Sequence, residues 1–214
     1  AALAQQGDFA ALLARENADG GVGPWVDGLV KAWAKMGVGD VTAAIAAFDA
    51  LTEEAGMRGL VMYHKALALS LVGDFEGADA IFAMPEAGAL RQTRRGAIAH
   101  IEVLSQLGRT EDAIKTLDQS FGTDLDPKLK NMRSALTAGE TLAFSQVRNA
   151  REGMSEVFYS VASALRNEAS EDYTLLYSRV AEHLNPNHID AILLSAGLLE
   201  QMERFELATA TYKR

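Results

Sequence analysis

"LVGDFEGADAIF" (residues 71–82) decides the fold, because it holds a helix end, a tight turn and a helix start within twelve residues. Diluted copies of the stretch recur at 5–14, 37–48, 106–117 and 201–212. Gly39 precedes Gly73 by 34 residues, and Gly73 precedes Gly108 by 35. A fixed period of this size is typical of stacked supersecondary units. The chain is therefore predicted to be an array of repeats.

Each unit is predicted to be a pair of amphipathic helices, because apolar residues recur on both sides of the turn at spacings of three and four. Gly73 takes the position where the first helix ends in a left-handed residue, and Asp74 follows where it can cap the second helix. Ala78 lies one turn into that helix and allows the two helices to approach closely. The matching residues of the other copies are Gly39, Asp40, Ala44, Gly108, Ala113 and Ala208.

Composition argues against several classes of partner and site. Its 214 residues carry a formal net charge of -9, which disfavours nucleic acid because that binding depends on cationic side chains. There is no Cys, so disulfides and thiolate metal sites are excluded. No apolar run approaches the roughly 20 residues that a membrane-spanning helix needs. Composition therefore argues against a nucleic-acid partner and against a membrane-spanning helix.

The repeat resembles the tetratricopeptide repeat. The shared pattern is a small residue in the first helix, Gly-Asp-aromatic at the turn, and then Ala and an aromatic in the second helix. "AEHLNPNH" (residues 181–188) resembles that family's usual ending, with Pro186 opening the next unit. The resemblance implies an all-α, right-handed α-solenoid of stacked antiparallel helix hairpins. The small first-helix residues are Ala32, Ala66, Ala162 and Ala196.

A single domain is expected over residues 1–214, as a fragment of a longer chain. An irregular insertion interrupts the array at 122–152, and within it "DPKLKNMRSALTAG" predicts a helix from Pro127 to just before Gly139. Thr174 and Ser178 replace the expected Ala and aromatic, so looser packing is predicted there. The predicted units are 1–20 (partial), 24–55, 58–86, 90–121, 153–186 and 187–214 (partial).

Four stretches resemble the middle of exported repeat proteins from alphaproteobacteria, which have no assigned activity. They are "VDGLVKAWAKMGVGD", "YHKALALSLVGDFEGA", "AGETLAFSQVRNAREGMSEVFYSVASAL" and "DYTLLYSRVAEHLNPNHIDAILLSAGLLEQM". This resemblance implies a periplasmic or exported protein. Composition alone leaves the cytoplasm as the alternative.

Residues with catalytic or metal-binding chemistry are present without the spacing that such chemistry needs. His183 and His188 flank Pro186, so they do not share the helix face that a metal-binding pair requires. No Gly-x-Ser-x-Gly motif and no phosphate-binding loop occurs. We therefore expect no enzyme activity, no cofactor and no metal.

Candidate partner-binding residues follow from the geometry that the family resemblance implies, in which first helices line a concave groove. For Trp33 and Tyr63, packing between hairpins is the alternative. The "RQTRRG" patch offers an anion or carboxylate anchor, and the alternative is a solvated helix start paired with nearby carboxylates. The candidates are Trp33, Tyr63, His64, Arg91, Arg94, Arg95, Glu102, Gln106, Tyr159, Ser163 and Arg166.

The function expected from these observations is a non-catalytic scaffold that binds a peptide or partner protein in the groove. The alternative is the regulatory or substrate-presenting arm of a larger enzyme. Self-association through the exposed ends of the array is a further possibility, because an uncapped hairpin leaves an apolar face.

Overall fold

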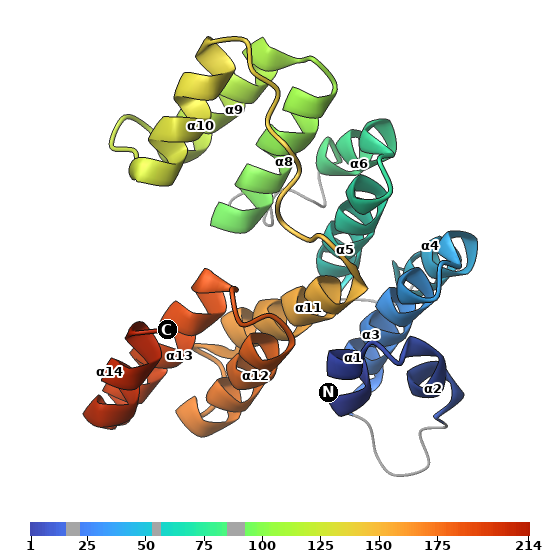
Figure 1. Ribbon diagram of the computed structural model, residues 1–214, viewed down its shortest axis with the longest axis vertical. Coiled ribbons are helices and arrows are strands. Elements are labelled where there is room, and N and C mark those ends of the chain that lie inside the picture. The colour runs from blue at the N-terminus through green and yellow to red at the C-terminus, as the bar shows by residue number, and fades with distance from the viewer. Residues whose placement is uncertain (16–21, 53–56, 85–92) are drawn as a thin grey trace. The chain divides into compact units, whose positions relative to one another are not determined.

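The computed structural model describes residues 1–15, 22–52, 57–84 and 93–214 (Figure 1). These residues form helices that pack in sequential pairs, and the described ranges contain no strand. The predicted all-α class is therefore confirmed. Contacts divide the chain into two compact units, of which unit 1 is 1–47 with 149–214 and unit 2 is 48–148. The single domain and the right-handed solenoid stay predictions.

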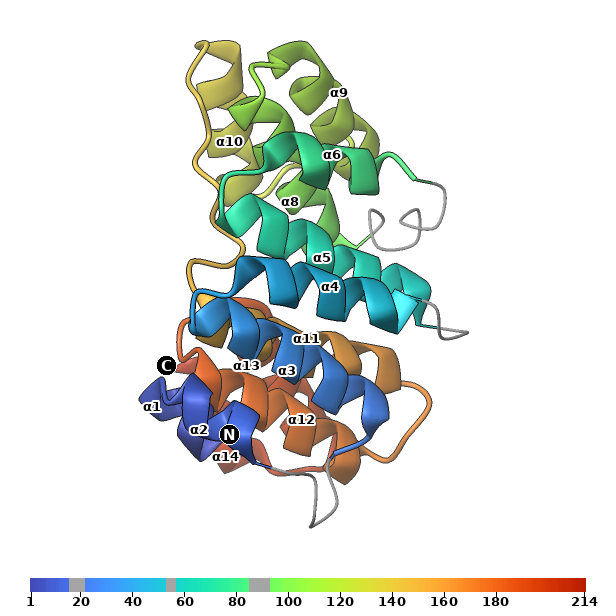
Figure 2. The ribbon, with the colours of Figure 1, turned by 90° about the vertical axis from the view of Figure 1, so that its right-hand side faces the viewer.

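Unit 2 contains two antiparallel hairpins followed by a single helix. Helix α5 packs on α6 (Figure 2), α8 packs on α9, and α9 packs on α10. The helix predicted from Pro127 is confirmed as α10. Residues 140–148, called the strap below, follow α10 and contain no helix. The bounds are α5 (Arg58–Leu71), α6 (Phe75–Phe82), α8 (Arg94–Gln106), α9 (Thr110–Phe121) and α10 (Pro127–Thr137).

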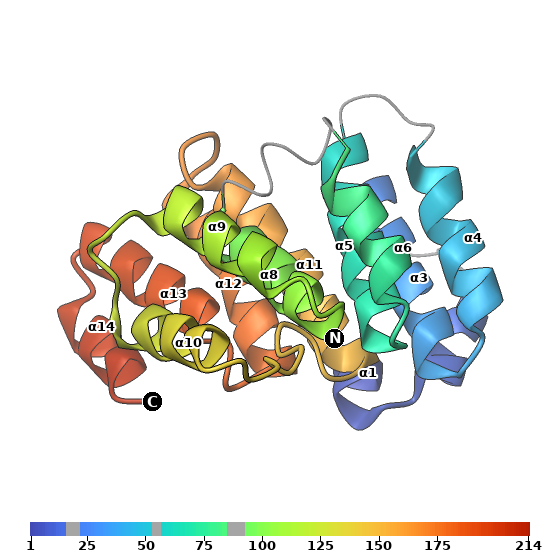
Figure 3. The same cartoon turned by 90° about the horizontal axis from the view of Figure 1, so that it is seen from above.

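Unit 1 contains both the N-terminal and the C-terminal segments of the chain. Helix α11 packs against α3 as well as against α12, and α12, α13 and α14 lie side by side (Figure 3). Gly153 of α11 sits directly against the Trp33 ring of α3, so a side chain at this position would collide with the indole. The bounds are α1 (Ala2–Gln6), α2 (Phe9–Ala14), α3 (Pro24–Gly37), α11 (Ala150–Leu165), α12 (Glu171–Leu184), α13 (Ile189–Gln201) and α14 (Phe205–Tyr212); α4 (Val41–Thr52) crosses the boundary between the units.

The turn between α5 and α6 has the predicted geometry. Gly73 has a φ of 84°, and the Asp74 backbone N–H donates to the Leu69 carbonyl at 3.0 Å. The Asp74 carboxylate then accepts the Gly77 N–H at 2.9 Å and caps α6. Left-handed glycines at Gly39 and Gly108 end α3 and α8 in the same way. The repeated turn is thus a helix C-cap joined to a helix N-terminus.

The last turn of this kind along the chain forms without glycine. Glu203, between α13 and α14, has a φ of 58° and is the one non-glycine residue with positive φ in the described ranges. The Arg204 N–H still donates to the Leu199 carbonyl at 2.7 Å. A left-handed conformation costs an ordinary residue about 1 kcal/mol or more, so hairpin packing overrides local preference here.

The predicted loosening at Thr174 and Ser178 is wrong, because both side chains are fully buried. The Ser178 hydroxyl donates to the Ala191 carbonyl at 2.9 Å. Its oxygen lies 2.7 Å from the Ser195 hydroxyl, and because the Ser178 proton is already used, Ser195 is the donor to Ser178. The Thr174 hydroxyl donates to the Ser170 carbonyl at 3.1 Å. Hydrogen-bonded hydroxyls fill the space in place of the expected apolar groups.

Candidate functional site

A polar stripe follows one face of α8 and forms the candidate site. It consists of Arg95, Glu102, Ser105 and Gln106, and we call it the α8 stripe. Spacings of seven, three and four residues place these side chains on the same side of a helix. Three of the four were predicted as groove residues. Arg95, Glu102 and Gln106 share one face of α8, and their contact with a partner stays a prediction.

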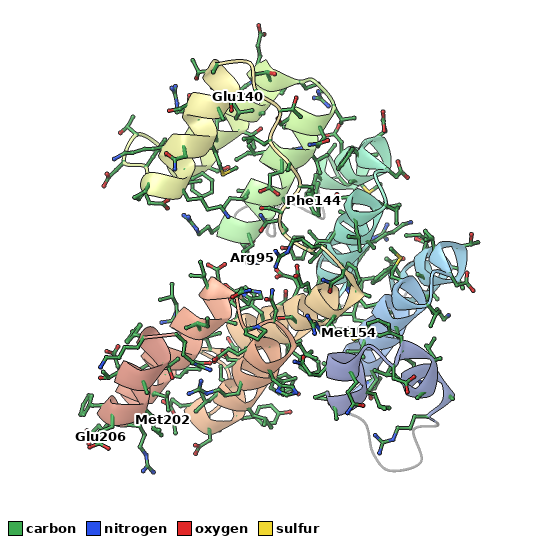
Figure 4. All side chains as sticks on the ribbon, in the orientation of Figure 1. Arg95, Glu140, Phe144, Met154, Met202 and Glu206 are labelled. Carbon is green, nitrogen blue, oxygen red and sulfur yellow. The ribbon has the colours of Figure 1, made fainter. Side chains whose placement is uncertain are left out.

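The strap lies along the α8 stripe, and its main chain is held at both carbonyl and N–H groups (Figure 4). Gln106 donates to the Leu142 carbonyl at 2.6 Å, and Ser105 accepts the Leu142 N–H at 2.9 Å. Glu102 accepts the Ser145 N–H at 2.8 Å. Arg95 donates to the Gln146 carbonyl at 3.1 Å. Every residue of the stripe thus contacts the backbone of one segment.

Glu102 also accepts hydrogen bonds from two side chains of the strap. Its Oε1 accepts the Ser145 hydroxyl at 2.6 Å, and both carboxylate oxygens lie 3.2–3.3 Å from Nε2 of Gln146. Only 3% of Glu102 is exposed. Burial raises the pKa of Glu102, and the hydrogen bonds from Ser145 and Gln146 partly oppose that rise. This carboxylate therefore depends on the strap for its donors.

The strap is extended where it crosses α8. Between Arg95 and Gln106 the helix advances about 16 Å, at about 1.5 Å per residue. Leu142 and Gln146 are four residues apart, and an extended chain spans about 13 Å over four residues. The long Arg95 side chain bridges the remaining distance to the Gln146 carbonyl. Burial alternates along it, with Leu142, Phe144 and Gln146 more covered than Ala143 and Ser145. Alternation with a period of two is that of an extended chain.

Arg94, in the basic patch at the start of α8, makes internal contacts. Arg94 lies 2.7 Å from the Asp126 carboxylate and 5.8 Å from the centre of the Phe121 ring. The hydrogen bond from Arg94 lowers the pKa of Asp126 below its usual value. Arg91 lies outside the described residues. The contacts of Arg94 favour the helix start paired with carboxylates over an anion anchor.

Besides Glu102, the predicted groove residues Trp33, Tyr63 and His64 lie in the interior. Trp33 and His64 are fully buried, and Tyr63 is 3% exposed. The Trp33 ring packs against Gly153 in unit 1, while Tyr63 and His64 make an edge contact at 5.5 Å in unit 2. Their burial favours the packing alternative over contact with a partner.

The remaining three candidates form a second stripe, which consists of Tyr159 and Ser163 of α11 and Arg166 at its C-cap, spaced four and three residues apart. We call it the α11 stripe. Ser163 and Arg166 are exposed. Tyr159 is half-buried, and its ring lies 4.7 Å from the His188 ring. Unlike the α8 stripe, this one presents a hydroxyl and a guanidinium to solvent.

A buried hydrogen bond between His188 and Glu156 in unit 1 was not predicted from the sequence. His188 Nε2 lies 3.0 Å from Glu156 Oε2, and each side chain is 1% exposed. His188 Nδ1 accepts the Ala191 N–H at 3.2 Å, so Nε2 carries the proton and donates to Glu156. The pair caps α13 and ties it to α11. Glu156 lies 32 positions from His188, and no local pattern links the two residues.

Known chemistry and known families give no further assignment. In the described ranges, no group of three or more His, Cys, Asp or Glu side chains is placed to hold a metal ion. Among these residues, no helix has both the length and the apolarity to span a membrane. No protein-family model matches the chain, and the comparison with curated proteins also finds no match.

Proposed function

We propose that the hairpins are tetratricopeptide-type repeats and that the protein is a non-catalytic scaffold that binds an extended segment of a partner protein. The repeat assignment is supported by the left-handed glycines that end α3, α5 and α8 at a period of 34 to 35 residues. It is also supported by the complete burial of Ala44, Ala78 and Ala113 at matching positions in the second helices.

One observation carries the proposal, which is the extended strap held along a first helix. The α8 stripe binds two backbone carbonyls and two backbone N–H groups of a non-helical segment. Contacts to the main chain supply affinity for any extended segment, while contacts to its side chains supply specificity. The fold therefore has the groups needed to bind an extended polypeptide.

The α11 stripe is the surface that we propose for the partner. Ser163 and Arg166 are exposed, and Tyr159 offers a half-buried ring beside them. A guanidinium can donate to carbonyl or carboxylate oxygens, and a tyrosine ring gives a large contact area with few rotatable bonds. Because this chain carries a formal net charge of -9, its partner in the proposal is a protein and not nucleic acid. By its resemblance to exported repeat proteins, we place the protein in the periplasm.

Selection of random twelve-residue peptides on the purified protein tests this function. Selected peptides are expected to bind saturably by isothermal titration calorimetry. A photoreactive group on such a peptide should crosslink to α11 and leave the exposed side of α9 unlabelled. Failure to select any saturable binder, or crosslinks mainly to α9, would refute the scaffold function.

A further inference from the structure

The strap shows which chemistry the α8 stripe accepts. Glu102 takes three donors from it, which are the Ser145 N–H, the Ser145 hydroxyl and the Gln146 amide. A buried carboxylate needs such donors, since leaving it unsatisfied is costly. Thr can take the place of Ser, and Asn is too short by one methylene to repeat the reach of Gln146. The stripe thus selects a hydroxyl residue followed by glutamine.

Apolar positions of the strap add a second requirement. Leu142 packs against the core that α8, α9 and α10 share, and Val147 is 1% exposed. Ser105 and Gln106 fix the Leu142 backbone, which sets the register between this apolar anchor and the Ser145–Gln146 pair. The pattern held by α8 is therefore Leu, two further residues, Ser and Gln, and in the strap the buried Val147 follows it.

We propose that the strap is an internal ligand of the α8 stripe, and that a partner segment with the pattern Leu-x-x-Ser-Gln competes with it for this face. This inference rests on the proposed scaffold function and names a partner for one surface of the scaffold. An internal ligand lowers the apparent affinity for an external one, because only the fraction of molecules with an open face can bind it. Weakening the strap should therefore strengthen binding.

Fluorescence anisotropy with a labelled peptide of residues 141–148, TLAFSQVR, tests the competition. The control peptide, TLAFAAVR, lacks only the Ser and Gln side chains. The 214-residue protein and its S145A/Q146A variant are each titrated with both peptides. The variant should bind TLAFSQVR about tenfold or more tightly than the unmodified protein, since losing side-chain bonds opens the face. Adding Glu102→Gln should remove that gain.

Equal binding of the two peptides by the variant, or no binding while it stays helical by circular dichroism, would overturn the proposal. So would a dimer by light scattering, because the strap of a second copy would then be the occupant. Peptides from the random selection that still bind α11 would leave the scaffold function standing in each case.

Hydrogen exchange on the unmodified protein decides the matter if the S145A/Q146A variant unfolds. The amides of Leu142 and Ser145 are expected to be protected, because both donate to α8 side chains. Saturating unlabelled TLAFSQVR should speed their exchange several-fold, whereas TLAFAAVR should not. Unchanged exchange with TLAFSQVR would overturn the proposal.

Discussion

The α8 and α11 stripes have similar residue spacings, but the chain covers the first and leaves two residues of the second exposed. Each lies on a first helix and carries polar side chains at spacings of three, four or seven residues. The strap covers the α8 stripe and takes up its hydrogen bonds, whereas Ser163 and Arg166 of the α11 stripe are exposed. Helical spacing thus identifies polar residues that share a face, and only the three-dimensional structure shows whether another part of the chain already covers them.

The comparison predicts its largest effect on stability at Glu102. Glu102→Ala should lower the free energy of unfolding by about 3 kcal/mol, because it leaves the strap donors from Ser145 and Gln146 without their acceptor. Urea denaturation measures the loss. Glu111→Ala is the control, since Glu111 is exposed on α9 and its removal should change stability by less than about 0.5 kcal/mol. Equal losses of stability in the two variants would contradict the claim that Glu102 holds the strap.

The side of α11 that packs against α3 should tolerate no added atoms. Gly153→Ala should destabilise the protein by about 2 kcal/mol, because the new methyl group would overlap the buried Trp33 ring. Gly197→Ala in α13 is the matched control. No heavy atom lies within 4 Å of a methyl group placed there, so the better helix propensity of Ala should raise stability by about 0.5–1 kcal/mol. Thermal unfolding compares them, and stabilisation by both would refute the close α3–α11 contact.

The pH dependence of stability should also show the raised pKa of Glu102. Its pKa is raised in the folded protein by burial, so the native state binds a proton more tightly than the unfolded chain does. This contribution is fully present below the ordinary glutamate pKa and is lost as pH rises through the raised value. The unfolding free energy of the unmodified protein, minus that of Glu102→Gln, should therefore fall between acidic and neutral pH. Urea titrations across this range would show a constant or rising difference if the inference were wrong.

The smallest effect on stability is expected at the α11 stripe. Ser163→Ala and Arg166→Ala should each change the free energy of unfolding by less than about 0.5 kcal/mol, because both side chains are exposed. Together they should weaken selected peptides about tenfold or more, measured by calorimetry, since a desolvated arginine contributes strongly at interfaces. Unchanged peptide affinity would remove α11 from the proposed binding surface.

Sequence patterns predicted the local elements well, because these depend on nearby residues. The turn at Gly73 and the helix opening at Pro127 follow from the left-handed freedom of glycine and the fixed φ of proline. The Glu203 turn shows the limit of that reasoning, because stacking of α13 on α14 imposes a conformation that the residue itself disfavours.

The strap could not be predicted in the same way. Its partners on α8 lie 36 to 51 positions earlier in the chain, and no helical or repeat period connects them. A weak signal was available in Leu142, Phe144 and Gln146, which alternate as in an extended segment. Packing of Trp33 was one of two alternatives in the sequence, but its neighbour Gly153 could not be predicted, because it lies on a distant helix.

A double-mutant cycle between Glu102 and Ser145 tests the central claim most directly, namely that the α8 stripe holds the strap. Urea unfolding of the unmodified protein, Glu102→Ala, Ser145→Ala and the double variant gives their coupling energy. Direct contact through the hydroxyl predicts a coupling of about 1 kcal/mol or more. Additive effects, with a coupling within about 0.3 kcal/mol of zero, would contradict the account.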